Sequence, residues 1–434
     1  MQLYNFISFA GIFILLTFAW LISRFVFGNR DIINWPLTCW SIGLQILFAL
    51  FIFIVPAGIK LFQAINDFAV IVLSTASDGA KFVFGTLAAP PGTEESLGFI
   101  LAFQAFPTII FFSALVSILY YYNILPFIIR QFAKLFTRLM KISGAEALCA
   151  ASNIFVGVES AFTIKPYIQK MTRSELCTIL TAGMATVASN VLALYVFTLY
   201  TQFPSIAGHL ISASFLSAPA ALVMSKILFP ETKTPKTLGK VVDIHYEKDA
   251  SIFEAIINGA TSGLKVVFSI VALLIAVLGL VALIDLAIGG VGSKLNIWME
   301  ITIDWSLKGL LGYLFYPFTL IIGIPIEDAK IISQIIGERI ILTEVASYQD
   351  LATAISNNKL IHARSAVVTS YALCGFAHVA SMAIFVGGIT ALAPKRTTAI
   401  SKVAFKALIA ATLACLLTAC IAGTFFTNTS ILFG

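Results

Sequence analysis

The sequence predicts an all-α polytopic membrane protein. Of its 434 residues, 59% are hydrophobic and 11% are charged, and the mean hydropathy is +0.98, which leaves too little polar surface to cover a soluble globule. Several apolar stretches reach the roughly 20 residues that a helix needs to cross a bilayer. Two further apolar intervals are interrupted by glycine, proline and charged residues, as is typical of re-entrant and discontinuous helices.

Uninterrupted apolar stretches are predicted to span the membrane as helices. The first has no charge before Arg24 and no small-residue cleavage site behind a basic start. We therefore expect it to stay in the chain as a helix rather than to be removed as a signal peptide. The predicted spans are 4–27, 37–59, 99–122, 174–200, 206–229, 264–288 and 397–424.

The intervals 143–170 and 306–392 are equally apolar but are broken by residues such as Gly157, Pro166 and Gly323. Irregular backbone at membrane depth is tolerated only where protein buries it or where it lines a watery cavity. We therefore predict one re-entrant hairpin over 143–170, a second over 306–350, and a discontinuous helix over 363–392 that makes an eighth crossing.

Two segments outside the spans help to divide the chain. Residues 125–141 place lysines and arginines opposite a face of Phe, Ile and Leu, which predicts an amphipathic helix in the membrane interface. The charged segment 229–250 is predicted to link two halves. The expected organisation is N-terminal scaffold helices with an interfacial helix in 1–98, a first repeat in 99–250 and a second repeat in 251–434.

Basic residues predict the orientation, because lysine and arginine gather in cytoplasmic loops. The clusters within 130–141, 226–248 and 395–402 should therefore face the cytoplasm. With eight crossings, both termini then lie outside, and the two hairpins enter from opposite sides. Opposed hairpins indicate an inverted repeat, the design of secondary transporters that bind substrate and coupling ion near the midplane.

A short echo in the sequence agrees with an inverted repeat. Arg173-Ser174 leads to Ala-Thr-Val-Ala-Ser at 185–189, and Arg364-Ser365 leads to Ala-His-Val-Ala-Ser at 377–381. Small residues recur in any packed membrane helix, so the echo supports the repeat only together with the opposed hairpins.

Composition and motifs exclude several functions. The six cysteines are scattered singly through apolar segments, which argues against a disulfide framework and a cysteine metal site. The net charge of +6 comes from basic residues in loops between apolar segments, so it does not indicate nucleic-acid binding. The sequence has no zinc-protease, serine-hydrolase or P-loop motif, and we expect neither an enzyme nor a bound cofactor.

Two polar runs at membrane depth are the candidate functional sites. Glu159 lies in the run 153–160, and Glu344 and His378 lie in the run 343–381. A charged side chain at the bilayer centre costs about 2.5–3.5 kcal/mol even on the lenient insertion scale. A chain that keeps carboxylates there is expected to use them.

Ordered blocks of the sequence match a known pattern over nearly the whole chain. They include Ile33-Asn34-Trp35, the runs 107–115 and 323–329, Lys165-Pro166-Tyr167-Ile168 and the run 369–377. In these blocks and in their order, the chain resembles the concentrative nucleoside transporter family.

The resemblance implies a sodium site made of neutral oxygens. In the family, an asparagine side chain and a carbonyl of the first hairpin join a serine hydroxyl and a carbonyl of the next helix. The matching positions here are Asn153, Val156, Thr186 and Val187, and threonine keeps the hydroxyl oxygen. Some members that use protons lack the asparagine, so its presence favours sodium as the coupling ion.

The resemblance also implies a substrate site between the hairpins. Its base end would be shaped by Val158, Glu159 and Ser160, but the usual glutamine is here Val158 and the carboxylate is displaced by one position. Val191 matches an apolar residue that packs on the base. On the sugar side, the residues implied to hold hydroxyls are Glu344 and Ser381, with His378 in place of an asparagine.

The expected function is cation-coupled uptake of nucleosides, with sodium favoured, by a homotrimer in the cytoplasmic (inner) membrane. One alternative keeps the fold but uses protons, or carries a non-standard nucleoside-like compound or a polyol, because the first hairpin and His378 depart from the family pattern. A second alternative is a passive channel or a membrane sensor.

Overall fold

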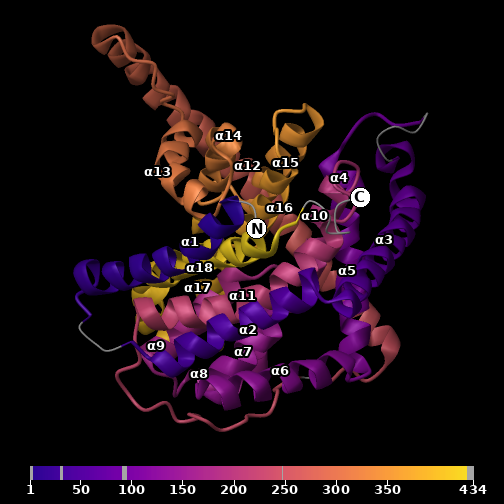
Figure 1. Ribbon diagram of the computed structural model, residues 1–434. Coiled ribbons are helices and arrows are strands. Elements are labelled where there is room, and N and C mark those ends of the chain that lie inside the picture. The colour runs from indigo at the N-terminus through magenta and orange to yellow at the C-terminus, as the bar shows by residue number, and fades with distance from the viewer. Residues whose placement is uncertain (1–2, 30–32, 90–94, 247, 428–434) are drawn as a thin grey trace.

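The computed structural model describes residues 3–29, 33–89, 95–246 and 248–427, and the Val158 side chain lies outside the described part. Eight helices in this part are long and apolar enough to cross a membrane. This confirms the all-α polytopic architecture expected from composition (Figure 1). Their bounds are Leu3–Val26, Trp35–Phe53, Pro56–Ala88, Leu101–Tyr121, Arg173–Leu199, Ile206–Leu228, Ile252–Met299 and Pro394–Phe425.

Three helices precede the repeats: α1 (Leu3–Leu21), α2 (Trp35–Phe53) and α3 (Pro56–Phe84). Asn34 caps α2 by accepting a hydrogen bond from the Leu37 amide at 3.2 Å. The pattern-based list of spans omits α3, because lysines and aspartates interrupt its apolar residues. The helical segment Pro56–Ala88 that contains α3 is nevertheless long and apolar enough to cross a membrane.

The first repeat begins at α5 (Phe106–Tyr121), after the short α4 (Leu101–Gln104), and continues into the amphipathic α6 (Ile124–Met140). As predicted, α6 buries an apolar face and leaves its basic residues on the other side. Hairpin one follows, with the bounds expected from the sequence. It comprises α7 (Gly144–Asn153), the 3-10 segment η3 (Val158–Ile164) and α8 (Lys165–Ile168).

The second repeat has the same order of elements. The long α12 (Ile252–Met299) is followed by α13 (Leu307–Ile321) and by hairpin two, which consists of α14 (Ile326–Glu338) and α15 (Glu344–Ser356). The two hairpins approach the centre of the molecule from opposite sides (Figure 1). The predicted range 306–350 for hairpin two differs from the structure, because Gly323, with φ of +85°, ends α13 in a turn and makes it a separate helix.

A broken helix completes the core of each repeat. Residues 363–392 form α16 (Ala363–Leu373) and α17 (Val379–Leu392), as predicted. The span 174–200 was expected to be continuous, and this is wrong: α9 (Arg173–Ala185) and α10 (Ser189–Leu199) are separated by extended backbone at Thr186. Hairpin one contacts this break: the Ser189 amide donates a hydrogen bond to the Phe155 carbonyl of the hairpin at 3.3 Å.

The same contact recurs in the second repeat, where the Val379 amide donates to the Ile340 carbonyl of hairpin two at 3.0 Å. Each hairpin therefore ends against the broken helix of its own repeat. Each broken helix is followed by a long buried helix, α11 (Ile206–Leu228) after the first and α18 (Thr397–Phe425) after the second.

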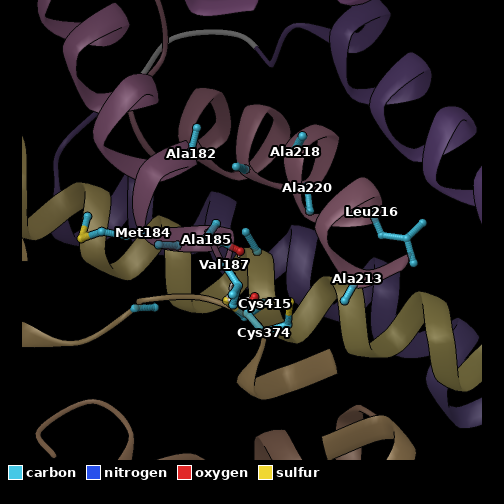
Figure 2. Packing of buried hydrophobic residues seen from close by; sticks show 14 of the residues in the cluster. Ala182, Met184, Ala185, Val187, Ala213, Leu216, Ala218, Ala220, Cys374 and Cys415 are labelled. Atoms are coloured by element: carbon cyan, nitrogen blue, oxygen red, sulfur yellow. Dashed lines mark hydrogen bonds between the residues drawn. The ribbon is translucent and has the colours of Figure 1, made fainter. Parts of the chain in front are cut away.

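The two breaks pack against each other at the centre of the molecule. The Cys415 thiol of α18 donates to the Ala185 carbonyl at 3.8 Å and to the Cys374 carbonyl at 3.6 Å. Figure 2 shows Ala185, Val187, Cys374 and Cys415 gathered at this point. A side-chain carbon on Gly375 would lie 2.6 Å from the Cys415 sulfur and 2.8 Å from the Ala185 carbonyl oxygen. The crossing has no room for a larger residue.

We predict that Gly375→Ala destabilises the fold, because the added methyl group must displace backbone at the crossing, at a cost of about 1–3 kcal/mol. Gly387→Ala in α17 is the matched control, since nothing lies within 4 Å of its added carbon. The melting temperature of the purified protein checks this: the Gly375 variant should melt lower than the Gly387 variant, and equal values would contradict the packing described.

Candidate functional site

A cavity of about 270 Å³ lies where the two hairpins and the second halves of the broken helices meet. Its polar side is formed by Glu344 of hairpin two with His378 and Ser381 at the start of α17. Its apolar side includes Val191 of α10 and Phe385 of α17. Part of α12 closes the cavity from the side. The cavity therefore lies between residues of both repeats, and its lining combines polar and charged groups with apolar side chains.

The structure brings most of the predicted binding residues to this cavity, namely Glu159, Val191, Glu344, His378 and Ser381. Ser160 is not among them. Its hydroxyl accepts a hydrogen bond from the Cys149 thiol at 3.7 Å, and it is buried inside hairpin one. The Val158 side chain, also predicted at the base end, lies outside the described part of the chain.

Glu344 is the centre of the polar wall. It is the first residue of α15, behind the cap Thr343, so the positive end of the helix dipole faces its charge. Its Oε1 accepts a hydrogen bond from the Tyr195 hydroxyl at 2.6 Å. Its Oε2 lies 2.8 Å from His378 Nε2, and only 5% of its side chain is exposed. Tyr195 thus holds one oxygen of the carboxylate by a hydrogen bond, while Oε2 lies close to His378 but accepts no hydrogen bond from any residue that the structure describes.

His378 caps α17 through its ring. Nδ1 accepts a hydrogen bond from the Ser381 amide at 3.2 Å, which requires Nδ1 to carry no proton. In this arrangement the ring proton lies on Nε2, which faces both the Glu344 carboxylate and, at 2.6 Å, the Ser381 hydroxyl. The polar groups pair with one another, and a ligand with several hydroxyls could replace these pairings one by one.

A second cluster lies behind the cavity, where hairpin one meets the break between α9 and α10. Asn153, the last residue of α7, donates from Nδ2 to the Cys149 carbonyl at 3.0 Å. Its Oδ1 is buried and accepts no hydrogen bond from any residue that the structure describes. Thr186 lies at the break, directly after α9, and its buried hydroxyl accepts a hydrogen bond from the Ser217 hydroxyl at 3.0 Å.

This cluster offers oxygens and no charge. Val156 and Val187, the other two predicted ion ligands, are both buried. Among the described residues, no group of three or more His, Cys, Asp or Glu side chains could hold a metal ion. Because α7 and α9 both end here, their carbonyl ends carry partial negative charge toward the cluster. Such a place suits a hard monovalent cation rather than a transition metal.

Glu159 occupies a different position from the other carboxylate. It lines the central cavity and also a neighbouring cavity of about 250 Å³ that Tyr120 and His245 help to form. Asn190 lines both cavities too and donates from Nδ2 to the Ser113 hydroxyl at 3.1 Å. Glu159 therefore stands between two chambers and can act on a ligand from the side of hairpin one.

Sequence reasoning missed several polar residues of this site, among them Tyr195, Asn190 and the α12 residues Lys265 and Ser269. Tyr195 lies one helical turn after Val191, on the same face of α10, and it stacks on Tyr348 with ring centroids 4.6 Å apart. That spacing is a usable signal, but only with the knowledge that Val191 faces a cavity. Asn190 was hidden in a span that was expected to be a plain helix.

Comparison with known proteins covers both halves of the chain. The family model described as Na+ dependent nucleoside transporter N-terminus matches residues 10–87, and the corresponding C-terminus model matches residues 209–423. A model described as nucleoside recognition matches residues 102–202 between them. The nucleoside permease NupC of Helicobacter pylori is 34% identical over 422 residues, which cover 96% of this chain and 97% of the permease.

The chain belongs to the concentrative nucleoside transporter family.

Other relatives agree with this assignment. Mouse solute carrier family 28 member 3 is 35% identical over 433 residues, and the chain spans 58% of the length of that relative. The solved structure of CNTnw in an inward-facing substrate-bound state matches with a TM-score of 0.87 at 31% identity, covering 98% of this chain and all of that one. The chain therefore shares its overall fold with a solved member of this family, and eight of its described helices are long and apolar enough to cross a membrane.

We predict that Tyr195→Phe destabilises this family member, because it leaves Oε1 of the buried Glu344 carboxylate without its donor. Hydrogen bonds to charged groups contribute about 1.5–3 kcal/mol. Tyr200→Phe is the matched control on the same segment, since Tyr200 is 41% exposed. Thermal unfolding in detergent should show a clear loss for Tyr195→Phe alone. Identical unfolding of both variants would mean that Tyr195 does not hold Glu344.

Proposed function

We propose that this protein carries nucleosides inward across the cytoplasmic membrane and draws the energy from a sodium gradient. The observation that carries the proposal is the buried carboxylate of Glu344, held beside His378 and Ser381 at the polar wall of a cavity between the two repeats. Hydroxyl pairs are natural partners for a carboxylate of this kind, because they can donate two hydrogen bonds to it.

The polar and the apolar residues that line the cavity suit the two parts of a nucleoside. The sugar hydroxyls would bind Glu344, Ser381 and His378, and the flat base would lie against Val191 at the apolar wall. Glu159 would meet the edge of the base from hairpin one. Because Glu159 is displaced by one position from the family's carboxylate, we expect it to set base preference. Val158 and Ser160 stay proposed as residues that shape the base end indirectly through the hairpin.

The cluster behind the cavity is proposed to hold the sodium ion. Its ligands would be the Asn153 amide oxygen, the Thr186 hydroxyl, and the backbone carbonyls of Val156 and Val187. The buried Oδ1 of Asn153, which has no partner among the described residues, supports this assignment. Burying such an oxygen costs folding free energy unless a ligand binds it. The carbonyl ends of α7 and α9 add negative potential at the same place.

Hairpin one would couple the ion to the substrate. It supplies two of the proposed ion ligands, Asn153 and Val156, and also Glu159 at the cavity. When sodium orders the hairpin, part of the entropic cost of binding the substrate is already met, so each ligand strengthens the other.

The basic loops indicate the orientation of the protein in the membrane, and α12 indicates which surface faces lipid or other copies of the protein. With α3 left out of the count and the broken helix of α16 and α17 counted as one crossing, both termini are proposed to lie outside and the linker 229–250 inside. None of the most apolar window of α12 is buried within the chain, which leaves a long apolar face for lipid or other copies of the protein. We propose a homotrimer in which α12 and the early helices form the shared scaffold, while the hairpins and broken helices carry the substrate.

Proton coupling is the second candidate, and one contact favours it. His378 Nε2 lies 2.8 Å from Glu344 Oε2, so a proton taken up by this pair would change the charge of the substrate site itself. A different substrate, such as a polyol, would use the same wall of hydroxyl-binding groups.

We predict that proteoliposomes containing the protein accumulate labelled uridine above the outside concentration when sodium is higher outside. Glu344→Gln should abolish accumulation while leaving the melting temperature close to that of the parent protein, because an amide keeps the size but loses two acceptor sites for hydroxyls. Gln349→Glu on the next turns of α15, outside the cavity, is a control for charge changes on this helix.

The outcomes separate the alternatives. Uptake that persists when choline replaces sodium but collapses with a protonophore would establish proton coupling. Equilibration without accumulation would indicate a channel, and the absence of any flux would favour a sensor. Unchanged uptake by Glu344→Gln would refute the role of that carboxylate, and a competition panel of nucleosides and polyols would identify the substrate class.

A further inference from the structure

Arg339 is a buried positive charge that the proposed transport site does not use. It follows α14 directly, in the turn of hairpin two, and it is the largest of the fully buried side chains with 0% exposure. Its neighbour Glu338 pairs with Lys308 at 2.6 Å instead. Among the described residues, no carboxylate forms an ion pair with Arg339.

The partners of the guanidinium are neutral and few. Nη1 donates to the Ala372 carbonyl at 2.5 Å, and the Cys415 thiol lies next to the group. Nε and Nη2 have no hydrogen-bond partner in the part of the chain that the structure describes. Burying an arginine this way is costly unless the surroundings supply negative potential.

Helix ends supply that potential. α14 ends at Glu338 and α16 ends at Leu373, so the carbonyl ends of both half-helices point to the region of Arg339 and Ala372. A cation is stabilised at the carboxyl end of a helix, and two converging ends add their effects. The Arg339 side chain supplies the positive charge that the carboxyl ends of α14 and α16 favour.

The same arrangement exists in the first repeat, where α7 ends at Asn153 and α9 ends at Ala185. The equivalence is fixed by one matching contact: Ser189 donates to the Phe155 carbonyl in the first repeat and Val379 to the Ile340 carbonyl in the second. Phe155 lies two residues after the end of α7, and Ile340 two residues after the end of α14. Arg339 therefore occupies in hairpin two the region that the proposed ion cluster occupies in hairpin one.

We propose that the Arg339 guanidinium is a resident cation of the second repeat, bound at the converging ends of α14 and α16 as the coupling ion is bound at the converging ends of α7 and α9. This rests on the proposed ion site for the comparison, but not for the role of Arg339 itself. Hairpin two is then held on its broken helix at all times, whereas hairpin one is held only when an ion is bound. The asymmetry makes hairpin one the ion-sensitive half.

Chemical rescue tests the proposal with the full-length protein. Arg339→Ala removes the charge and leaves a space shaped like guanidinium, and we expect uptake to fall by about tenfold or more. Millimolar guanidinium should restore uptake and raise the melting temperature of this variant. Urea, which has nearly the same shape but no charge, should do neither. Arg339→Lys should retain most of the uptake, because it keeps a cation between the helix ends.

Two controls keep the outcomes distinct. Arg396→Ala removes another arginine that donates to a single carbonyl, that of Met171 at 2.6 Å, but away from these helix ends. It should show no response to guanidinium. If the parent protein does not transport nucleosides, the melting-temperature arm still tests Arg339. Equal rescue by urea and guanidinium, or an Arg339→Ala protein as active and as stable as its parent, would overturn the proposal.

Discussion

The ends of half-helices inside the membrane are the constraint on which this structure depends. A helix that stops at membrane depth leaves unpaired amide or carbonyl groups where no bulk water can satisfy them. Four half-helices, α7, α9, α14 and α16, stop near the centre with their carbonyl ends. The amino ends of α15 and α17 begin at the same depth with Thr343 and His378 as caps. Each end must be matched by a charge, a cap or a ligand.

Two buried charges in the core follow this requirement. Glu344 is a carboxylate at the amino end of α15, and Arg339 is a cation at the carboxyl ends of α14 and α16. The carboxyl ends of α7 and α9 have only neutral oxygens, including the unpartnered Oδ1 of Asn153. In the second repeat the helix carboxyl ends are matched by a buried cation, whereas in the first repeat they are not. The first repeat can therefore bind a cation from solution at these ends.

The sequence predicts the spans, hairpin one and the second broken helix because glycine, proline and charge mark them directly. The break at Thr186 was missed, because Ala185 to Ser189 contains no glycine or proline and the interruption comes from the contact with hairpin one. The similarity of 185–189 to 377–381, inside the predicted discontinuous helix, was the signal that could have indicated it. The extent of hairpin two was missed because a single turn at Gly323 separates α13 from it.

The site shows a similar division. Carboxylates and a histidine at membrane depth are conspicuous in sequence, and the structure brings Glu344 and His378 within 2.8 Å. Tyr195 and Arg339 were not singled out, because a tyrosine in a span has many ordinary explanations and the sequence does not show what an arginine inside the predicted hairpin 306–350 would meet. Their roles depend on which atoms they meet across the fold, 149 residues away for Tyr195 and Glu344. The position of Ser160 depends on the fold in the same way, since its hydroxyl accepts a hydrogen bond from Cys149 inside hairpin one and does not line the cavity.

The central claim is that one hairpin joins the ion to the substrate, and equilibrium linkage tests it most directly. Uridine affinity should be measured against sodium concentration, and sodium affinity against uridine concentration, in the purified protein and in Asn153→Ala. The account predicts that each ligand tightens the other by the same factor in the parent protein, and that the factor falls to one in the variant. Uridine binding that is equally tight with and without sodium, in a protein that binds both, would contradict the account.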